Sequence, residues 1–239
     1  KYLKIPISVR KTKNFDFIKV NGKKNFSSFN YNIPSDISSS AFFIVLTLLS
    51  NNSSLTIRNV NINSSRTGSI YILNKMGAKI KLKNIKKYRG ERVADIFVKS
   101  IKSYKAINCP KKYNSSAIDE FLIIFLIAAK AKGVSYFKDL AELNQKESPR
   151  LKLGSKILNM IGIKTKLTNE SIKIYGQPNL ELNKNYEIKN YLKDHRIFMM
   201  ATIASLTLGG NWKIHDPDSI KTSFPSFLKI IKKFGVKIN

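Results

Sequence analysis

Residues 119–129 read DEFLIIFLIAA, two carboxylates followed by nine apolar residues without a break. A helix formed by such a run is apolar on every side, so it is stable only where other elements surround it. Similar segments occur twice more, AFFIVLTLL at 41–49 and IFMMATIASL at 197–206. The sequence therefore predicts three helices buried at the centre of the fold.

An internal repeat is built around these helices. Each apolar segment follows an aspartate and is itself followed by a short strand, a second amphipathic helix, a glycine and an alternating strand. The aspartates and closing glycines are Asp36 and Gly77, Asp119 and Gly162, and Asp194 and Gly235, separated by 41, 43 and 41 residues. Spacing this regular marks one structural unit used three times. Glycine at the end of each second helix is the expected left-handed C-cap.

The second helix of each unit has a different pattern. RLKLGSKILNMI (150–161) and PSFLKIIKKF (225–234) place apolar residues every three or four positions with lysines between them, which predicts helices on the outside. Segments such as KIKLK (79–83) and SIKIYG (171–176) alternate and need only one buried face. These patterns predict an α/β fold of three repeated βαβαββ units, with small sheets and outer helices in a ring around buried helices.

The first residues resemble the end of such a unit. KYLKIPISV (1–9) reads as a helix tail followed by a strand, and FDFIKV (15–20) as a second strand. We therefore expect residues 1–33 to be the tail of a truncated N-terminal domain of a longer protein. Residues 34–239 are expected to form a domain of three repeats, at about 34–104, 105–178 and 179–239.

Composition limits the possible locations. The longest apolar runs are about nine residues, whereas crossing a bilayer takes roughly twenty, so we expect no membrane association. Cys109 is the only cysteine and cannot form an internal disulfide, which favours a reducing compartment. The sequence therefore predicts a cytoplasmic protein.

The formal net charge of +28 is compatible with nucleic-acid binding. However, 36 of the 43 basic residues are lysines, which are scattered along the chain and accompany 23 asparagines. A dedicated binder more often clusters its charge and uses arginine for bidentate contacts. We keep nucleic-acid binding as an alternative, and expect small-molecule substrates rather than nucleic acid.

The starts of the apolar helices are candidate anion sites, because a helix N-terminus carries partial positive charge and free N–H groups. The ionisable residues near these starts are Lys146, Glu147, Arg150, His195 and Arg196. Two arginines suit a carboxylate or phosphate held bidentately, and the aspartate and glutamate offer two acid/base groups. We expect these residues to converge on one cavity.

The same residues have structural interpretations. The three aspartates can be helix N-caps, which we favour for Asp36. Ser148 and Pro149 form an ordinary helix start, while Lys146 and Glu147 can be a solvated pair.

Other polar residues are open to structural interpretations too. His195 and Arg196 can simply be polar residues at a helix start, although they then need partners. Arg66 can be structural, and Lys221 and Thr222 can be caps of the third outer helix. No cysteine or histidine cluster suggests a metal, and no glycine-rich loop suggests a nucleotide, so we expect no cofactor. The pattern alone indicates an anion-binding α/β protein with acid/base groups.

A set of seven motifs in this order resembles the 5-enolpyruvylshikimate-3-phosphate synthases, the 3-phosphoshikimate 1-carboxyvinyltransferases. The motifs are PSDISSSAFF, NSSRTG, GERVADIFVKS, AIDEFLIIFLIAAKAKG, LNQKESPR, DHRIFMM and TSFPSF. The resemblance covers nearly the whole chain and slightly more than the C-terminal half of the family. It implies the enolpyruvyl transferase fold, also described as an inside-out α/β barrel, with two domains in the full protein.

The resemblance implies transfer of the enolpyruvyl group of phosphoenolpyruvate to the 5-hydroxyl of shikimate 3-phosphate, with release of phosphate, in the shikimate pathway to chorismate and the aromatic amino acids. By motif, Asp119 is the base facing that hydroxyl and Lys146 is a shikimate 3-phosphate ligand beside it. Glu147 exchanges a proton with the methylene carbon of phosphoenolpyruvate. Arg150 and Arg196 hold phosphoenolpyruvate, and His195 is their neighbour.

The chain departs from the family pattern in several places. Asn144 and Pro149 replace an arginine and an aspartate, and Thr222 stands where some members have a lysine, with Lys221 adjacent. The family's N-terminal motifs are absent. We therefore expect this chain to be inactive alone. The full-length protein is expected to be a monomer. Enolpyruvyl transfer to another acceptor is the alternative within the same fold.

Overall fold

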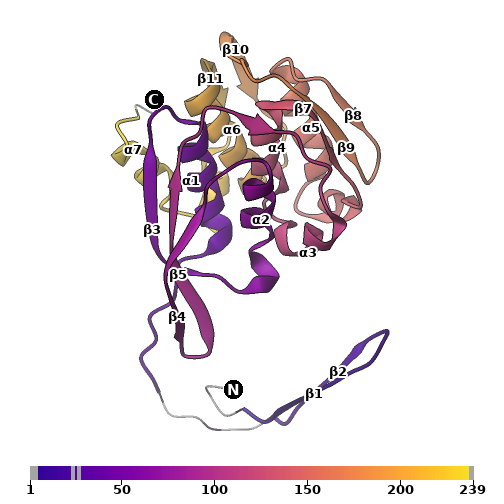
Figure 1. Ribbon diagram of the computed structural model, residues 1–239, viewed down its shortest axis with the longest axis vertical. Helices are drawn as coiled ribbons and strands as arrows, with labels where there is room; N and C mark the ends of the chain where they lie inside the picture. The colour runs from indigo at the N-terminus through magenta and orange to yellow at the C-terminus, as the bar shows by residue number, and fades with distance from the viewer. Residues whose placement is uncertain (1–4, 23–24, 26–27, 237–239) are drawn as a thin grey trace.

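The computed structural model describes residues 5–22, 25 and 28–236 of the chain. Three helices lie at its centre and contact one another, namely α1 (Ile37–Leu49), α4 (Phe121–Ala129) and α6 (His195–Leu208). Every residue of α4 is buried, as expected for a helix that is apolar on all sides. The prediction of buried central helices is confirmed, and Figure 1 shows the sheets and remaining helices around them.

Most of the other elements fall into three successive sets, each of which places a short 3-10 helix before an outer helix. The first set contains β3 (Ser54–Asn61), the 3-10 helix η1 (Ser64–Arg66), α2 (Gly68–Lys75), β4 (Lys81–Tyr88) and β5 (Glu91–Lys99). The second contains β6 (Tyr104–Lys105), η2 (Lys111–Tyr113), α3 (Asn114–Ala117), β7 (Ala131–Phe137), η3 (Ala141–Gln145), α5 (Arg150–Met160), β8 (Thr165–Leu167) and β9 (Ile172–Gly176). The third contains β10 (Leu182–Ile188), β11 (Gly209–Ile214), η4 (Pro217–Thr222) and α7 (Phe227–Lys233).

Each central helix connects two parallel strands or strand ends. A parallel bridge between Ser35 and Val60 flanks α1, β6 and β7 flank α4, and β10 and β11 flank α6. The sheets are then extended by antiparallel strands, giving the orders β3-β5-β4 and β6-β7-β9-β8. The sheets remain separate rather than closing into one barrel. This arrangement directs the starts of all three buried helices toward the same end of the fold.

The glycines that define the repeat lie where the outer helices end. Gly77, Gly162 and Gly235 have φ values of 102°, 84° and 83°, a region that only glycine adopts without strain. Their N–H groups donate to the carbonyl oxygens of Asn74, Asn159 and Lys232. All three predicted C-caps are therefore confirmed. The strand predicted after Gly235 falls largely on residues 237–239, outside the described residues.

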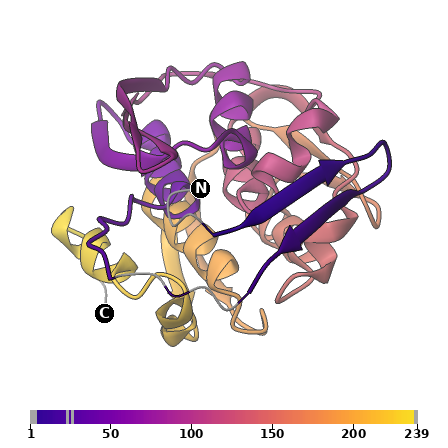
Figure 2. The same cartoon turned by 90° about the horizontal axis from the view of Figure 1, so that it is seen from below.

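The first strands form an antiparallel hairpin, β1 (Ile7–Lys11) with β2 (Asp16–Val20). It stands apart from the body of the molecule in Figure 1, and Figure 2 views the molecule from the side on which it lies. One face of the hairpin is formed by the exposed apolar pairs Ile7 with Val20 and Val9 with Ile18. The helix tail predicted at residues 1–4 lies outside the described residues.

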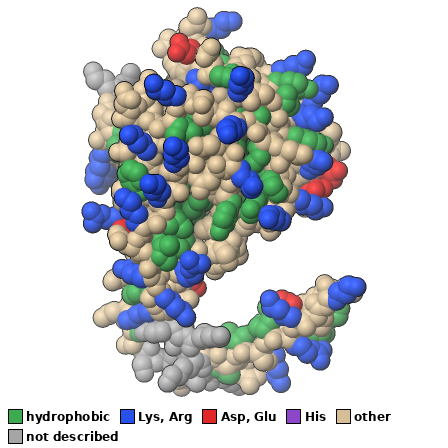
Figure 3. All heavy atoms as spheres, viewed as in Figure 1, with side chains coloured by type: hydrophobic (Ala, Val, Ile, Leu, Met, Phe, Trp, Pro, Cys, Tyr) green, Lys and Arg blue, Asp and Glu red, His purple; other side chains and the backbone are tan. Residues whose placement is uncertain are grey.

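Basic side chains are spread over the face shown in Figure 3, and they do not gather into one patch there. This distribution agrees with the scatter of lysines along the sequence. In the described part of the chain, no helix is long and apolar enough to span a bilayer.

Candidate active site

The starts of the three buried helices are linked through Arg66 and Arg196, by hydrogen bonds and ion pairs. On the α1 side, Ser38 Oγ accepts from Arg66 Nη2 at 2.7 Å. At the start of α6, Arg196 Nη1 donates to the backbone oxygen of Asp119, just before α4, at 2.8 Å. The three helix starts therefore lie close together, while the convergence of the site residues on one cavity stays a prediction.

Asp119 is at the centre of this region. Its carboxylate oxygens lie 3.5 Å from Arg66, 3.9 Å from Lys146, 3.5 Å from Arg150 and 3.9 Å from Arg196. The side chain retains 22% exposure. It is not the cap of α4, because the residue at the N-cap position is the next one along the chain. The Asp119 carboxylate is thus partly accessible to a ligand and faces four cations.

The corresponding aspartates of the other two units are N-caps. Asp36 Oδ2 accepts from the backbone N–H of Ser39 at 2.7 Å, which confirms the interpretation favoured from the sequence. Asp194 Oδ1 accepts from the backbone N–H of Arg196 at 2.9 Å. The same position in the repeat thus serves two different purposes.

Asp194 also anchors Arg150 inside the protein. Arg150 Nε donates to Asp194 Oδ2 at 2.9 Å, and Ser148 Oγ donates to the same oxygen at 2.7 Å. The two charged side chains are 2% and 0% exposed. Burial alone would raise the pKa of Asp194, but the hydrogen bond and charge of Arg150, with the bond from Ser148, lower that pKa overall. The ion pair therefore fixes the guanidinium beside Asp119.

Lys146 and Glu147 do not form a solvated pair with each other. Lys146 Nζ donates to Glu142 Oε1 at 2.6 Å and also faces Asp119. Glu147 pairs with Arg150, three residues further along, and its side chain is more than half exposed. Sequence reasoning missed Glu142, although its position four residues before Lys146 is the signal for such a pair.

His195 and Arg196 begin α6. Burial, together with the nearby charge of Arg196, lowers the pKa of His195 from its ordinary value, so this imidazole is neutral near pH 7. The Arg196 guanidinium faces the preceding helix start rather than solvent. Arg196 therefore has the partner that a charged residue at an apolar helix start requires.

The structure adds Glu120 to the residues predicted from sequence. Glu120 is almost completely buried, its Oε1 lies 4.0 Å from Arg196 Nη1, and this oxygen lacks a hydrogen-bond partner among the described residues. Burial raises the pKa of Glu120, an effect only partly offset by hydrogen bonding from Ser38 and the charge of Arg196. The adjacent carboxyls of Asp119 and Glu120 therefore have very different environments.

Replacing Glu120 by glutamine is expected to stabilise the chain at pH 8 by about 1 kcal/mol. A raised native pKa means that the folded state holds the proton more tightly, so stability falls as pH rises from the ordinary pKa toward the native one. The difference in unfolding free energy between the variant and the wild type should therefore vanish near pH 4, where the wild-type carboxyl is protonated. Urea unfolding at both pH values tests this, with exposed Glu170→Gln as the control. A wild type more stable than the variant at pH 8 contradicts it.

The third loop of the repeat does not reach this site. Lys221 Nζ pairs with Asp218 at 2.7 Å and its side chain is 70% exposed, while Thr222 Oγ1 donates to the Ser219 carbonyl. Neither contact caps α7, whose N-cap residue is Ser226 and which has no side-chain cap hydrogen bond, so the capping interpretation of Lys221 and Thr222 is wrong. Within the described residues, no group of three or more histidine, cysteine, aspartate or glutamate residues is placed to hold a metal.

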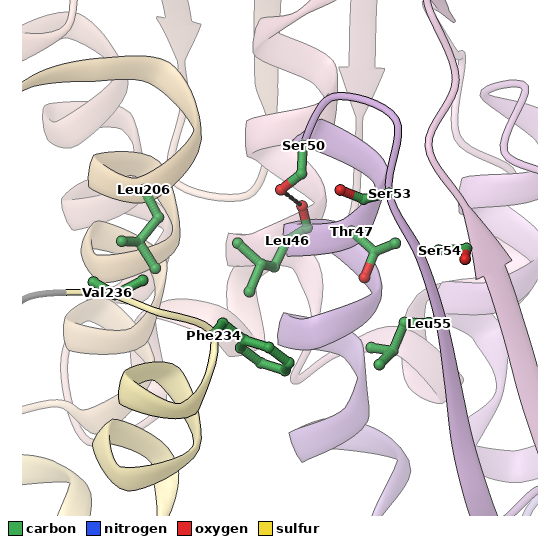
Figure 4. A pocket seen from close by; sticks show the side chains of 9 residues that line it. All are labelled: Leu46, Thr47, Ser50, Ser53, Ser54, Leu55, Leu206, Phe234 and Val236. Atoms are coloured by element: carbon green, nitrogen blue, oxygen red, sulfur yellow. Dashed lines mark hydrogen bonds between the residues drawn. The ribbon is translucent and has the colours of Figure 1, made fainter.

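A separate cavity of about 370 Å³ lies at the other end of α1 (Figure 4). It is lined by residues near the C-terminal end of α1, including Leu46 and Ser50, and by Leu206 and Phe234. Its walls are mainly apolar. It is therefore distinct from the charged group around Asp119.

The family model for EPSP synthase (3-phosphoshikimate 1-carboxyvinyltransferase) matches residues 1–231. This chain belongs to the EPSP synthase family. Among curated members, the 3-phosphoshikimate 1-carboxyvinyltransferase of Ruthia magnifica is 38% identical over 222 residues, which are 91% of this chain and 49% of the relative. That of Staphylococcus aureus is 37% identical over 203 residues, 85% of this chain and 46% of the relative. The chain thus spans about half the length of these curated relatives.

Solved structures agree with this membership. The EPSP synthase of Acinetobacter baumannii superimposes with a TM-score of 0.87 at 33% identity, over 97% of this chain and 52% of that one. The enolpyruvyl transferase NikO of Streptomyces tendae has a TM-score of 0.71 at 13% identity, over 98% and 51% of the two chains, which shows the shared fold alone. The enolpyruvyl transferase fold predicted from the motifs is confirmed.

Proposed function

We propose that this chain provides one face of the active site of a 3-phosphoshikimate 1-carboxyvinyltransferase. In this reaction the 5-hydroxyl oxygen of shikimate 3-phosphate bonds to C2 of phosphoenolpyruvate while a proton adds to its methylene carbon. Loss of that proton and cleavage of the C2–O bond to phosphate then give the enolpyruvyl ether and free phosphate. The observation that carries the proposal is the Asp119 carboxylate among four cations, at the joined starts of three buried helices.

The cations suit the two anionic substrates. Arg150 and Arg196 are assigned to phosphoenolpyruvate, whose carboxylate and phosphate match planar guanidinium groups. Lys146 is assigned to shikimate 3-phosphate, with His195 as a neutral neighbour of the arginines. The helix starts add partial positive charge at the same place. Binding therefore depends on groups already held in position by Asp194, Glu142 and the backbone of Asp119.

The acid/base assignments follow from the same geometry. Asp119 is assigned as the base that accepts the hydroxyl proton, because its carboxylate is partly accessible at the centre of the four cations. Glu147 is assigned to deliver and remove the proton at the methylene carbon, because its carboxylate is exposed beside Arg150. Lys146 Nζ lies 3.9 Å from Asp119 Oδ1 and stabilises negative charge there.

The domain division is part of the proposal. Residues 34–239 are assigned to the unit of three repeats, and residues 1–33 to a second unit that supplies the opposite face of the cleft. The exposed apolar face of the β1–β2 hairpin supports this, because a two-stranded sheet is marginally stable alone and such a face needs a covering layer. We assign the full-length protein to the cytoplasm as a monomer.

The test is phosphate release from phosphoenolpyruvate and shikimate 3-phosphate. It compares the 239-residue chain, the full-length protein that carries it, and the full-length Arg196→Ala variant. The proposal expects release that requires both substrates, an inactive isolated chain, and a KM for phosphoenolpyruvate raised about tenfold in the variant. The proposal is wrong if the full-length protein is folded but releases no phosphate. Other acceptors, and salt-dependent binding of nucleic acid, would then be measured.

A further inference from the structure

The four cations around Asp119 are divided between its two oxygens. Lys146 and Arg150 are nearest to Oδ1, whereas Arg66 and Arg196 are nearest to Oδ2. Three of these cations belong to the motifs assigned to substrate binding. Arg66 does not, and its role is unassigned.

Arg66 is held by an anchor of its own. Its Nη2 donates to Ser38 Oγ at 2.7 Å, on the first turn of α1, and the same nitrogen lies 3.5 Å from Asp119 Oδ2. The short helix η1 that carries Arg66 is capped by Asn63, whose side chain accepts from the backbone N–H of Ser65 at 3.1 Å. Its guanidinium therefore keeps its place without any contact to a substrate.

The internal repeat accounts for the position of Arg66 beside Asp119. Helix η1 precedes α2 in the first unit as η3 precedes α5 in the second and η4 precedes α7 in the third. Residues from the first two loops, Arg66 and Lys146, reach Asp119. Lys221 of the third loop is paired with Asp218 instead. The candidate site is thus assembled from two of the three equivalent loops, and Arg66 is the contribution of the first.

We propose that Arg66 is a positioning residue that holds the Asp119 carboxylate in its reactive orientation when both substrates are bound. This inference rests on the proposed function. Bound phosphate and carboxylate groups compete with Asp119 for the N–H donors of Arg150, Arg196 and Lys146. Arg66, tied to Ser38, remains at Oδ2. The other oxygen is left free to accept the hydroxyl proton, while Arg66 itself exchanges no proton.

The experiment uses the full-length protein with Arg66→Ala, Arg66→Lys and, as a matched control, Arg92→Ala. Arg92 is an exposed arginine on β5. Arg66→Ala should lower kcat about tenfold, with the KM for phosphoenolpyruvate within about twofold of wild type. Arg66→Lys should recover part of kcat, and Arg92→Ala should resemble wild type.

Chemical rescue separates positioning from a purely structural role. Because the Arg66 side chain is 47% exposed, millimolar guanidinium chloride should enter the space left in Arg66→Ala and restore part of kcat, whereas neutral urea at the same concentration should not. The proposal is overturned if Arg66→Ala matches Arg92→Ala, if its KM rises as in Arg196→Ala, or if guanidinium and urea act alike. In those cases the wild type still releases phosphate and the proposed function stands. Absence of release from folded wild type overturns both.

Discussion

Replacing Asp194 by asparagine is expected to lower the free energy of unfolding by about 3–5 kcal/mol. Asp194 and Arg150 are both shielded from water, and removing one charge leaves the other buried without full compensation. Asparagine can still cap α6, so the loss comes from the ion pair rather than from the helix start. The hydrogen bond from Ser148 is weakened as well, because its acceptor is no longer charged.

Urea unfolding of the 239-residue chain at pH 7 measures this loss, with Asp36→Asn as the control. Asp36 occupies the same position in the repeat, but it is exposed and caps only Ser39, so its replacement should change stability by about 0.5 kcal/mol or less. The pKa of Asp194 is lowered in the folded state. The stabilisation that the Asp194 carboxylate gives to the folded state is thus complete above the ordinary pKa of aspartate. It is lost as the pH falls through the lower native pKa. Equal stabilities of the two variants at pH 7 contradict the prediction.

The fold could be predicted from sequence because its signals are local. The nine-residue apolar run at 121–129 favours a buried helix, and a glycine such as Gly162 marks a helix end through its own backbone conformation. These signals recur at nearly constant spacing. The repeat therefore determines the architecture before any contact between distant residues is known.

The different role of Asp119 could not be predicted from that repeat. In the second unit, η2 and α3 lead directly into α4, and the residues before α4, Ile118 and Glu120, are already in a helical conformation. No extended N-cap residue is needed there, so the Asp119 side chain is released from capping. The preceding segment NSSA (114–117) was the available signal, since serine and asparagine favour helix starts.

Arg66 and Glu120 could not be placed from sequence for another reason. Their contacts join different units: Arg66 reaches Ser38 and Asp119 only after η1 and two buried helices have packed together. A sequence pattern predicts that a helix is buried. It does not predict which residues of other helices or strands a given side chain contacts. Family motifs indicated candidate substrate-binding residues, whereas the network of contacts that holds those residues required the structure.

Replacing Asp119 by asparagine in the full-length protein is expected to lower kcat by about 10²- to 10⁴-fold. Asparagine keeps the shape of the side chain but cannot accept the hydroxyl proton, and it no longer neutralises the cations around it. Glu147→Gln should have an effect of similar size, because it removes proton exchange at the methylene carbon. Initial rates of phosphate release at saturating substrate measure both.

The control is again Asp36→Asn, an aspartate of the same repeat whose carboxylate only caps a helix; its kcat should stay within about twofold of wild type. Calorimetric titration with shikimate 3-phosphate and phosphoenolpyruvate separates loss of chemistry from loss of binding. If Asp119→Asn is folded, binds both substrates and retains more than a third of kcat, Asp119 is not the base. The four cations would then be the functional feature of this site, and the carboxylate would serve only to hold them together before substrates bind.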